Sequence, residues 1–226
     1  MPWPRNAKIA FIGSHGIRKT TAALAFASAI QRAGRSVEFA REVVRDNPLG
    51  INEGATSEAQ LWVLTSQIRR ELELSRKAEC LVTDRGVMDN FAYYLRASGG
   101  EDPFDVEPLV RKWSRTYDLV VRLTPDVEIR ADGVRSTSDR FRDEIEAILD
   151  ARLPRLVPRD RLVVQAASAI TENHDWWPLA EQLAFRLGEP LLAQGVSRPR
   201  PPRAQSKTSR RNDPAHEDQL ALDLGR

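Results

Sequence analysis

A lysine and a threonine close a glycine-rich turn near the start of the chain, at a spacing that suits phosphate chemistry. The stretch "GSHGIRKTT", residues 13–21, matches the pattern G-x-x-x-x-G-K-[ST] at Gly13, Lys19 and Thr20. In such a loop the backbone N–H groups cradle phosphate oxygens, the lysine reaches the β- and γ-phosphates, and the hydroxyl is a ligand of Mg²⁺. We therefore predict a loop that binds ATP with Mg²⁺. The residues expected to contact the nucleotide are Gly13, Ser14, His15, Gly16, Ile17, Arg18, Lys19, Thr20 and Thr21.

Arg18 occupies the position directly before Lys19, where the loop pattern requires glycine. Glycine there lets the backbone approach a phosphate and permits dihedral angles that other residues avoid. In one interpretation the arginine points outward and nucleotide binding is retained. In the other the loop is distorted and turnover is slow. From the sequence alone, we predict that Arg18→Gly restores the usual loop geometry and raises turnover.

A carboxylate ends the buried strand pattern "CLVTD", residues 80–84, and an arginine follows it. Ligands of open α/β sheets bind at the carboxyl ends of the strands, so Asp84 and the glycine-rich loop are expected to meet there. Asp84 would then hold Mg²⁺ together with Thr20, and Arg85 would lie at the mouth of the site. The alternative is that Asp84 caps a helix and Arg85 is a surface residue.

These residues must be positioned by the apolar runs and helical patterns that alternate along the chain. Strands are predicted at residues 9–12, 37–40, 80–84, 118–123 and 161–166. Helical periodicity predicts a helix over residues 20–33 and another around Leu61, Leu64 and Leu72, with Ser57 as its cap. Continuous apolar strands between helices indicate an α/β fold, a three-layer parallel sheet of about five strands with helices on both faces.

Composition limits the classes of protein that this chain can belong to. The 226 residues support one domain of ordinary size with appendages. Cys80 is the single cysteine, which excludes an intrachain disulfide and a cysteine metal cluster. Apolar runs fall short of the about 18 residues that a membrane span needs, and the first residues lack a signal-peptide pattern. We therefore expect a cytoplasmic protein, and the net charge of +2 argues against nucleic-acid binding over its whole surface.

Four stretches together resemble the small kinase-like group of AAA-type P-loop ATPases, which is related to nicotinamide riboside kinases and to thymidylate and deoxynucleoside kinases. They are "GSHGIRKTT", "FAREVVRDNPLGINEGATSEAQLWVLTSQIRRELE", "VTDRGVMDNFAYYLR" and "DGVRSTSDRFRDEIEAIL", and the resemblance extends over residues 8–190. It implies a P-loop NTPase fold and an ATP-dependent phosphotransferase that acts on a nucleoside, a nucleotide or a related small metabolite.

The resemblance also implies an acceptor site after the second strand, in "AREVVRDNP". Glu42 would accept a proton from a hydroxyl nucleophile or orient it, and Arg41 would hold an anionic acceptor. Gln67, on the second predicted helix, would read a base edge or an amide, and Arg85 would contact the acceptor too. The alternatives are a solvated ion pair of Arg41 with Glu42, and a hydrogen bond of Gln67 at the edge of the core.

A charged stretch with helical periodicity at its end, residues 126–150, is interpreted as a lid. Phosphoryl transfer needs positive charge at the γ-phosphate, and Arg135 and Arg140 are placed to supply it when a lid closes. The alternative is a solvated surface hairpin. The expected catalytic set is therefore Lys19, Asp84, Glu42, Arg135 and Arg140.

Composition changes to proline, arginine and small polar residues beyond the domain, which we place at residues 1–195, and predicts a disordered basic tail at 196–226. The tail contains "QLALDL", which resembles the peptides by which bacterial proteins dock on the replication sliding clamp. Gln219, Leu220, Leu222 and Leu224 would make that contact, and the basic residues would bind DNA only weakly. A second function therefore stays open: an ATPase, or a nucleotide-dependent switch or adaptor weakened by Arg18 and recruited through this tail.

Overall fold

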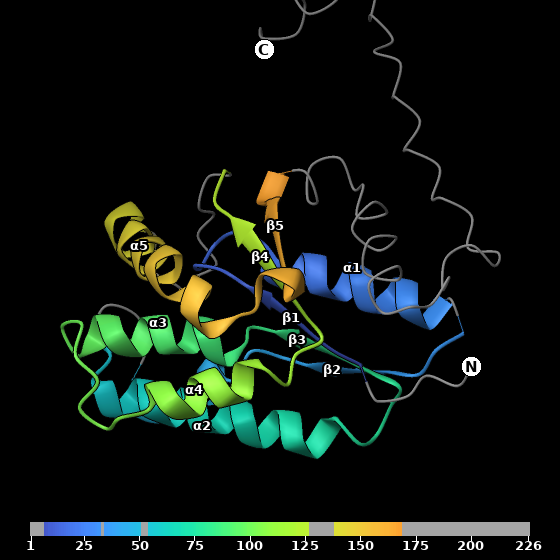
Figure 1. Ribbon diagram of the computed structural model, residues 1–226, viewed down its shortest axis with the longest axis horizontal. Helices are drawn as coiled ribbons and strands as arrows, with labels where there is room; N and C mark the ends of the chain where they lie inside the picture. The colour runs from blue at the N-terminus through green and yellow to red at the C-terminus, as the bar shows by residue number, and fades with distance from the viewer. Residues whose placement is uncertain (1–6, 33, 51–53, 127–137, 169–226) are drawn as a thin grey trace, which may run out of the picture.

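A five-stranded parallel sheet forms the centre of the protein in the computed structural model, which describes residues 7–32, 34–50, 54–126 and 138–168 (Figure 1). The strand order is β2-β3-β1-β4-β5, and each neighbouring pair runs parallel. The strands are β1 (Ala7–Ile12), β2 (Val37–Ala40), β3 (Cys80–Asp84), β4 (Leu119–Thr124) and β5 (Leu162–Ala166). The predicted three-layer α/β fold is confirmed, and all five predicted strands are present.

The central strands are apolar throughout because both faces of the sheet are covered. Every residue of β1 and β3 is buried. Along β1 the side chains alternate between two cores: Ile9 and Phe11 belong to one, and Ala10 and Ile12 belong to the other. This double burial fixes the register, since a slip by one residue would exchange the two faces.

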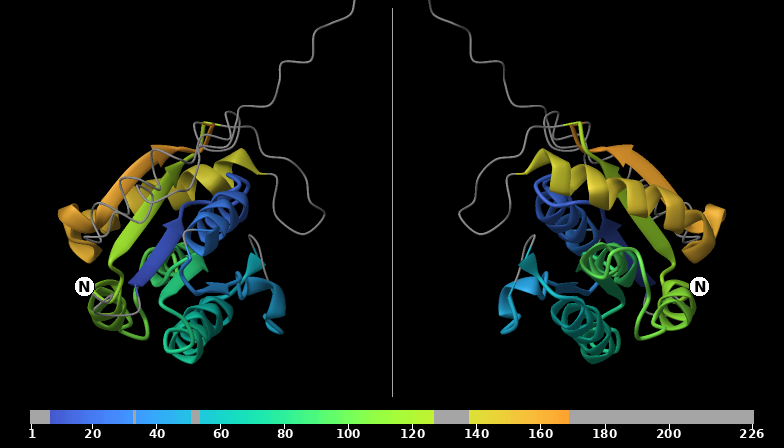
Figure 2. Two further views of the ribbon diagram at one scale, coloured as in Figure 1. Left: turned by 90° about the vertical axis from the view of Figure 1, so that its right-hand side faces the viewer. Right: turned by 90° about the vertical axis from the view of Figure 1, so that its left-hand side faces the viewer.

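Helices cover the two faces unequally (Figure 2). The helices are α1 (Lys19–Arg32), α2 (Ser57–Leu74), α3 (Val87–Ala97), α4 (Glu107–Ser114) and α5 (Asp139–Leu156), with short 3-10 turns at Val44–Asp46 and Arg159–Arg161. In the described ranges, α1 packs on one face through residues such as Phe26. The opposite core contains Phe91 of α3 and Ile145 of α5, and α2 packs against α3.

Two details of the helices differ from the sequence-based prediction. The cap of α2 is Thr56, whose side chain accepts a hydrogen bond from the Ala59 N–H at 3.2 Å, and Ser57 is already helical. Helix ends are commonly uncertain by one or two residues, and here either of two adjacent hydroxyl residues could be the cap. Helix α4 was not predicted, because its eight residues include a proline and carry only a short apolar pattern.

Several predicted features lie outside the described residues. They include Arg135, most of the segment between β4 and α5, and the whole tail with its "QLALDL" stretch. None of the helices in the described part of the chain is long and apolar enough to cross a membrane.

Strand pairing brings the predicted site residues together at one edge of the sheet, the edge formed by the carboxyl ends of the strands. Phe11 of β1 pairs with Asp84 of β3, so the glycine-rich loop that follows β1 begins beside Asp84. The loop then leads directly into α1, whose first residue is Lys19. Because β2 neighbours β3 in the same parallel direction, Glu42, two residues beyond β2, lies at this edge as well.

Candidate functional site

The glycine-rich loop starts at a position that has no room for a side chain. Gly13 has a φ of +143°, and a Cβ placed there would lie 2.5 Å from Ile17 Cδ1 and 2.7 Å from the Leu123 carbonyl oxygen. Gly16 also has a positive φ, of 76°. Ile17 is fully buried and anchors the loop in the core under α1. The sequence therefore forms a tight turn that opens at the N-terminus of a helix, where backbone amides favour anions.

Lys19 and Thr20 face into this turn and toward β3. The Lys19 ammonium donates a hydrogen bond to the Ser14 carbonyl oxygen across the loop. The Thr20 hydroxyl donates to the Asp84 carboxylate, with 2.5 Å between Oγ1 and Oδ2. A cation, a hydroxyl and a carboxylate thus converge at the start of α1.

Arg18 has a φ of 59°, the left-handed conformation that glycine would supply at this position. A non-glycine residue pays about 1 kcal/mol for it, a small cost that the surrounding contacts can offset. The Arg18 carbonyl oxygen accepts the Ala22 N–H at 3.2 Å, so α1 continues normally from the loop. Arg18 therefore already has the positive φ that glycine would allow, so the backbone at this position gives no reason to expect a large gain from Arg18→Gly.

We now expect Arg18→Gly to change the dissociation constant of Mg·ATP by less than about three-fold, under 1 kcal/mol. Arg18→Val should weaken binding more, because a β-branched residue at positive φ is strongly disfavoured. Isothermal titration calorimetry on the two variants and the unchanged protein measures both effects. A gain in affinity of about ten-fold or more for the glycine variant would show that the arginine distorts the loop.

Arg85 lies on the other side of the site, between two carboxylates. Its guanidinium forms a buried ion pair with Glu42 and lies 3.5 Å from Asp89 Oδ2. It also lies 4.7 Å from the centre of the Tyr93 ring, a cation–π distance. All four residues are buried, so this acceptor-side cluster, Glu42, Arg85, Asp89 and Tyr93, is a built interior site rather than a solvated surface pair.

Burial and charge shift the pKa values of this site. Burial, followed by the Arg85 cation, lowers the pKa of Lys19 to about 7. Burial raises the pKa of Asp89 to about 6, against the opposing effect of Arg85. Burial opposes the charge on Arg85, but Glu42 and Asp89 together raise its pKa well above the usual value. Perturbed values that occur together are typical of functional sites.

Binding of Mg·ATP is expected to take up a proton when the pH lies above the Lys19 pKa. At about pH 8 the Lys19 amine is mostly neutral in the free protein, and the phosphates favour its charged form. At about pH 6 the ammonium is already present and uptake from this group vanishes. Calorimetry in buffers of different ionisation enthalpy measures the uptake. Equal proton exchange at the two pH values would contradict a lowered Lys19 pKa.

The loop is tied to α5, which contains the second half of the predicted lid segment, residues 139–150. That half is a helix packed on the core through Phe141, Ile145 and Leu149. The Ser14 N–H donates to Glu146 Oε1 at 3.0 Å, and Glu146 also forms an ion pair with Arg122 of β4. His15 lies 3.2 Å from the Tyr93 hydroxyl through Nδ1, and its ring stacks on Phe141 at 5.0 Å. These contacts link the position of α5 directly to the position of the glycine-rich loop.

Other predicted site residues lie apart from this cluster. Arg41 is exposed, and Arg140 projects from α5 with 90% of its side chain accessible and an ion pair to Glu144. Gln67 is completely buried and contacts the carbonyl of Arg85 from behind. Arg135 lies outside the described residues. The structure thus brings Lys19, Thr20, Asp84, Glu42 and Arg85 to one edge and leaves Arg41 and Arg140 at the surface.

Asp89, Tyr93 and Glu146 were not anticipated as site residues. Arg85, Asp89 and Tyr93 follow one another at four-residue intervals, which is the spacing of neighbours on one helical face. The four-residue spacing from Arg85 was therefore a usable sequence signal for Asp89 and Tyr93. Glu146 was not recoverable from the sequence, because its partner Ser14 lies 132 residues away.

The Thr20 and Asp84 oxygens fit a magnesium ion that also binds substrate phosphates. Mg²⁺ prefers oxygen ligands and usually takes one or two from the protein while keeping water and phosphate oxygens. In the described ranges no group of three or more His, Cys, Asp or Glu side chains is placed to hold a metal ion. Mg²⁺ held there would neutralise charge on the phosphates.

The fold and the loop geometry define a kinase-like P-loop NTPase. A family model for an AAA domain matches residues 8–168, and the chain belongs to that family. A search of curated proteins by sequence found no match.

Two solved structures of NadR protein share this fold at low sequence identity. NadR protein in complex with NR aligns with a TM-score of 0.63 at 18% identity, over 87% of this chain and 54% of the NadR chain. NadR protein in complex with NAD and AMP-PNP aligns with a TM-score of 0.57 at 15% identity, over 86% and 51%. Thymidylate kinase from Ehrlichia chaffeensis aligns with a TM-score of 0.48 at 17% identity, over 82% of this chain and 100% of the other. This chain thus spans about half the length of the NadR chains that it matches.

Proposed function

We propose that this protein is an ATP-dependent phosphotransferase that acts on a hydroxyl group of a nucleoside, a nucleotide or a related small metabolite. The observation that carries the proposal is the convergence at one sheet edge of two kinds of site. The loop with Lys19, Thr20 and Asp84 suits the phosphates and Mg²⁺, and a buried Glu42–Arg85 pair stands beside it. A simple phosphate-binding loop does not require the second.

Each of these residues would have a separate role in an in-line transfer of the γ-phosphoryl group. The acceptor oxygen would attack the γ-phosphorus, the bond from that phosphorus to the β,γ-bridging oxygen would break, and ADP would leave. Glu42 would take the proton of the acceptor hydroxyl. Lys19 would stabilise the charge that develops on the phosphoryl oxygens, and Arg85 would orient the Glu42 carboxylate through their ion pair.

The charge balance of the acceptor-side cluster favours an uncharged acceptor. The Arg85 cation is already balanced by Glu42 and Asp89, so the cluster offers hydrogen bonds but no surplus positive charge. An acceptor that carries its own phosphate would be drawn instead to exposed Arg41. A nucleoside-like hydroxyl compound therefore fits the buried cluster better than a nucleotide does.

The proposal is tested by a panel of nucleosides, nucleotides and related metabolites incubated with the protein and Mg·ATP. Mass spectrometry should detect a phosphorylated product. Glu42→Gln should suppress the product while ATP binding persists, and Glu38→Gln, a matched glutamate change within β2, should leave product formation intact. ATP consumption that yields only inorganic phosphate for every compound would favour the ATPase or switch function instead.

We also propose, from the sequence of the tail, that "QLALDL" recruits the protein to a sliding clamp. A labelled peptide spanning residues 213–226 should bind purified bacterial clamp, with leucines in an apolar pocket and Gln219 hydrogen-bonded at its rim. Changing Gln219, Leu220 and Leu222 together to alanine should abolish binding. No binding at high clamp concentration, or binding that survives the triple change, would refute the recruitment.

A further inference from the structure

Gln67 is enclosed in the core behind the site, with no solvent exposure. Its amide Nε2 donates two hydrogen bonds, to Glu71 Oε1 at 2.9 Å and to the Arg85 carbonyl oxygen at 3.3 Å. A glutamine amide has two N–H groups, and both are used here within the protein. The amide nitrogen therefore contacts the backbone of the acceptor-side cluster, whereas the amide oxygen has no hydrogen-bond partner among the described residues.

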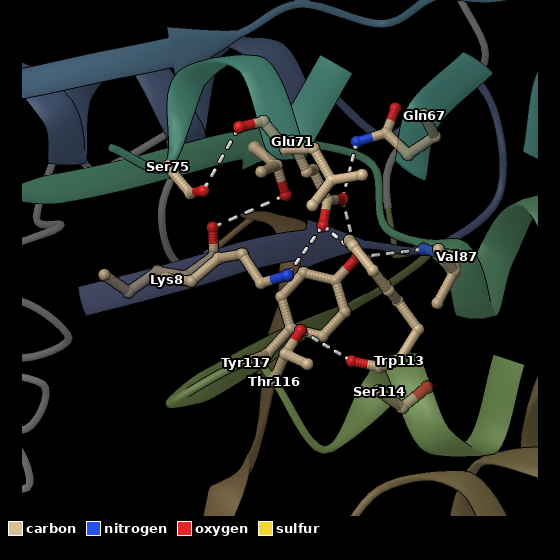
Figure 3. Close-up of polar contacts among 12 residues, drawn as sticks. Lys8, Gln67, Glu71, Ser75, Val87, Trp113, Ser114, Thr116 and Tyr117 are labelled. Atoms are coloured by element: carbon tan, nitrogen blue, oxygen red, sulfur yellow. Dashed lines mark hydrogen bonds and ion pairs between the residues drawn. The ribbon is translucent and has the colours of Figure 1, made fainter. Parts of the chain in front are cut away.

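Glu71 orients that amide because it is the centre of a buried polar network (Figure 3). Its Oε1 accepts from Gln67 and from the Tyr117 hydroxyl, the latter at 2.6 Å. Its Oε2 accepts from the Lys8 ammonium and from Trp113 Nε1, each at 2.8 Å. Four donors, from α2 itself, β1, α4 and the connection that follows α4, hold one buried carboxylate, so the side chains bonded to it have little freedom.

Two arms of this network end on the same short turn. Gln67 donates to the carbonyl of Arg85, and the Tyr117 hydroxyl accepts the N–H of Val87 at 3.2 Å. On the sheet side, the Arg85 N–H donates to the Phe11 carbonyl oxygen at 3.0 Å. The turn between β3 and α3 is thus held from both sides.

That turn needs support because Arg85 has a φ of 87°. A non-glycine residue in this conformation persists only where its surroundings determine it, and such residues gather at functional sites. The same conformation directs the guanidinium to Glu42 and Asp89. Relaxation of the backbone at Arg85 would therefore move the charged group out of that pair.

We infer that Gln67 is a positioning residue, which, with Tyr117 and through their shared partner Glu71, holds the turn at residues 85–87 so that Arg85 stays between Glu42 and Asp89. This assigns Gln67 a role different from the base-reading role expected from the sequence. The catalytic consequence rests on the proposed function, since it matters only if Arg85 lines the transfer site. The structural part stands independently of any acceptor.

The test uses Gln67→Met, which keeps the length of the side chain and removes both donors. The control is Gln60→Met, because Gln60 is a buried glutamine on the same face of α2, two turns earlier. In spectra of arginine Nε–H groups, the assigned Arg85 signal should shift or disappear in the Gln67 variant and stay in place in the Gln60 variant. An unmoved Arg85 signal in folded Gln67→Met would overturn the inference.

A second variant keeps the test decisive if Gln67→Met does not fold. Tyr117→Phe removes one hydroxyl with the ring retained, and it should shift the same Arg85 signal by releasing the Val87 N–H. With a phosphorylated acceptor in hand, kcat of Gln67→Met should fall by about 10²-fold with the KM for ATP unchanged. A change of acceptor preference with the Arg85 signal in place would instead make Gln67 a base reader. Failure of phosphotransfer in the unchanged protein would refute the proposed function and leave the Arg85 shift to be seen.

Discussion

Replacing Lys19 by alanine is expected to lower ATP turnover by about 10²–10³-fold, the loss typical of removing one charge-stabilising donor from a transition state. The ammonium is the cation at the glycine-rich loop, where the γ-phosphate would lie, and it is buried. Lys112→Ala is the control, because it removes an exposed lysine of α4 that does not belong to the glycine-rich loop. Steady-state ADP release measures both variants.

The same change should not make the protein less stable. Burial lowers the pKa of Lys19, which means that the folded protein holds this charge at a cost. Removing it should leave the free energy of unfolding unchanged or higher, as is common for residues kept for activity.

Turnover by Lys19→Ala equal to that of the unchanged protein would show that the loop is not the site of ATP binding.

Replacing Glu71 by glutamine is expected to lower the free energy of unfolding by about 3–5 kcal/mol, the usual cost of removing one partner of a buried ion pair. The Glu71 side chain is 0% exposed and that of Lys8 is 8% exposed. The Lys8 ammonium would keep its contacts with the Trp113 and Tyr117 rings but lose its only charged partner among the described residues. Urea denaturation followed by circular dichroism measures the change.

Glu73→Gln provides the control on the same helix. Glu73 pairs with Arg69 and Arg70 at the surface, where such ion pairs contribute about 0.3–0.5 kcal/mol. Its replacement should therefore be nearly neutral. Comparable losses for the two glutamates would contradict the view that Glu71 is the buried centre of the network.

The fold was predictable because its main determinants are local in the sequence. Apolar runs mark the five strands, and the spacing of Gly13, Lys19 and Thr20 marks a loop that must lie between a strand and a helix. The parallel arrangement then places Asp84 near the loop without any knowledge of side-chain contacts. The left-handed conformation of Arg18 was not predictable, since the residue type alone argues against it.

The interior of the site was less predictable because its contacts join distant parts of the chain. Lys8 and Glu71 are 63 residues apart, and each resembles a surface residue in its own local pattern. Gln67 could be placed near the apolar face of its helix, but its actual partner, the Arg85 carbonyl, depends on how α2 packs behind β3. Buried polar groups must find such partners, yet the sequence does not say which ones.

The central claim is that the γ-phosphate of ATP goes to a small organic hydroxyl compound at this site. The most direct measurement follows ATP labelled in its γ-phosphate, incubated with the protein, Mg²⁺ and the panel of acceptors. The predicted result is label on an organic product in an amount equal to the ADP formed, absent in Lys19→Ala and suppressed in Glu42→Gln. Label recovered only as inorganic phosphate, or retained entirely in ATP with every acceptor, would contradict the account.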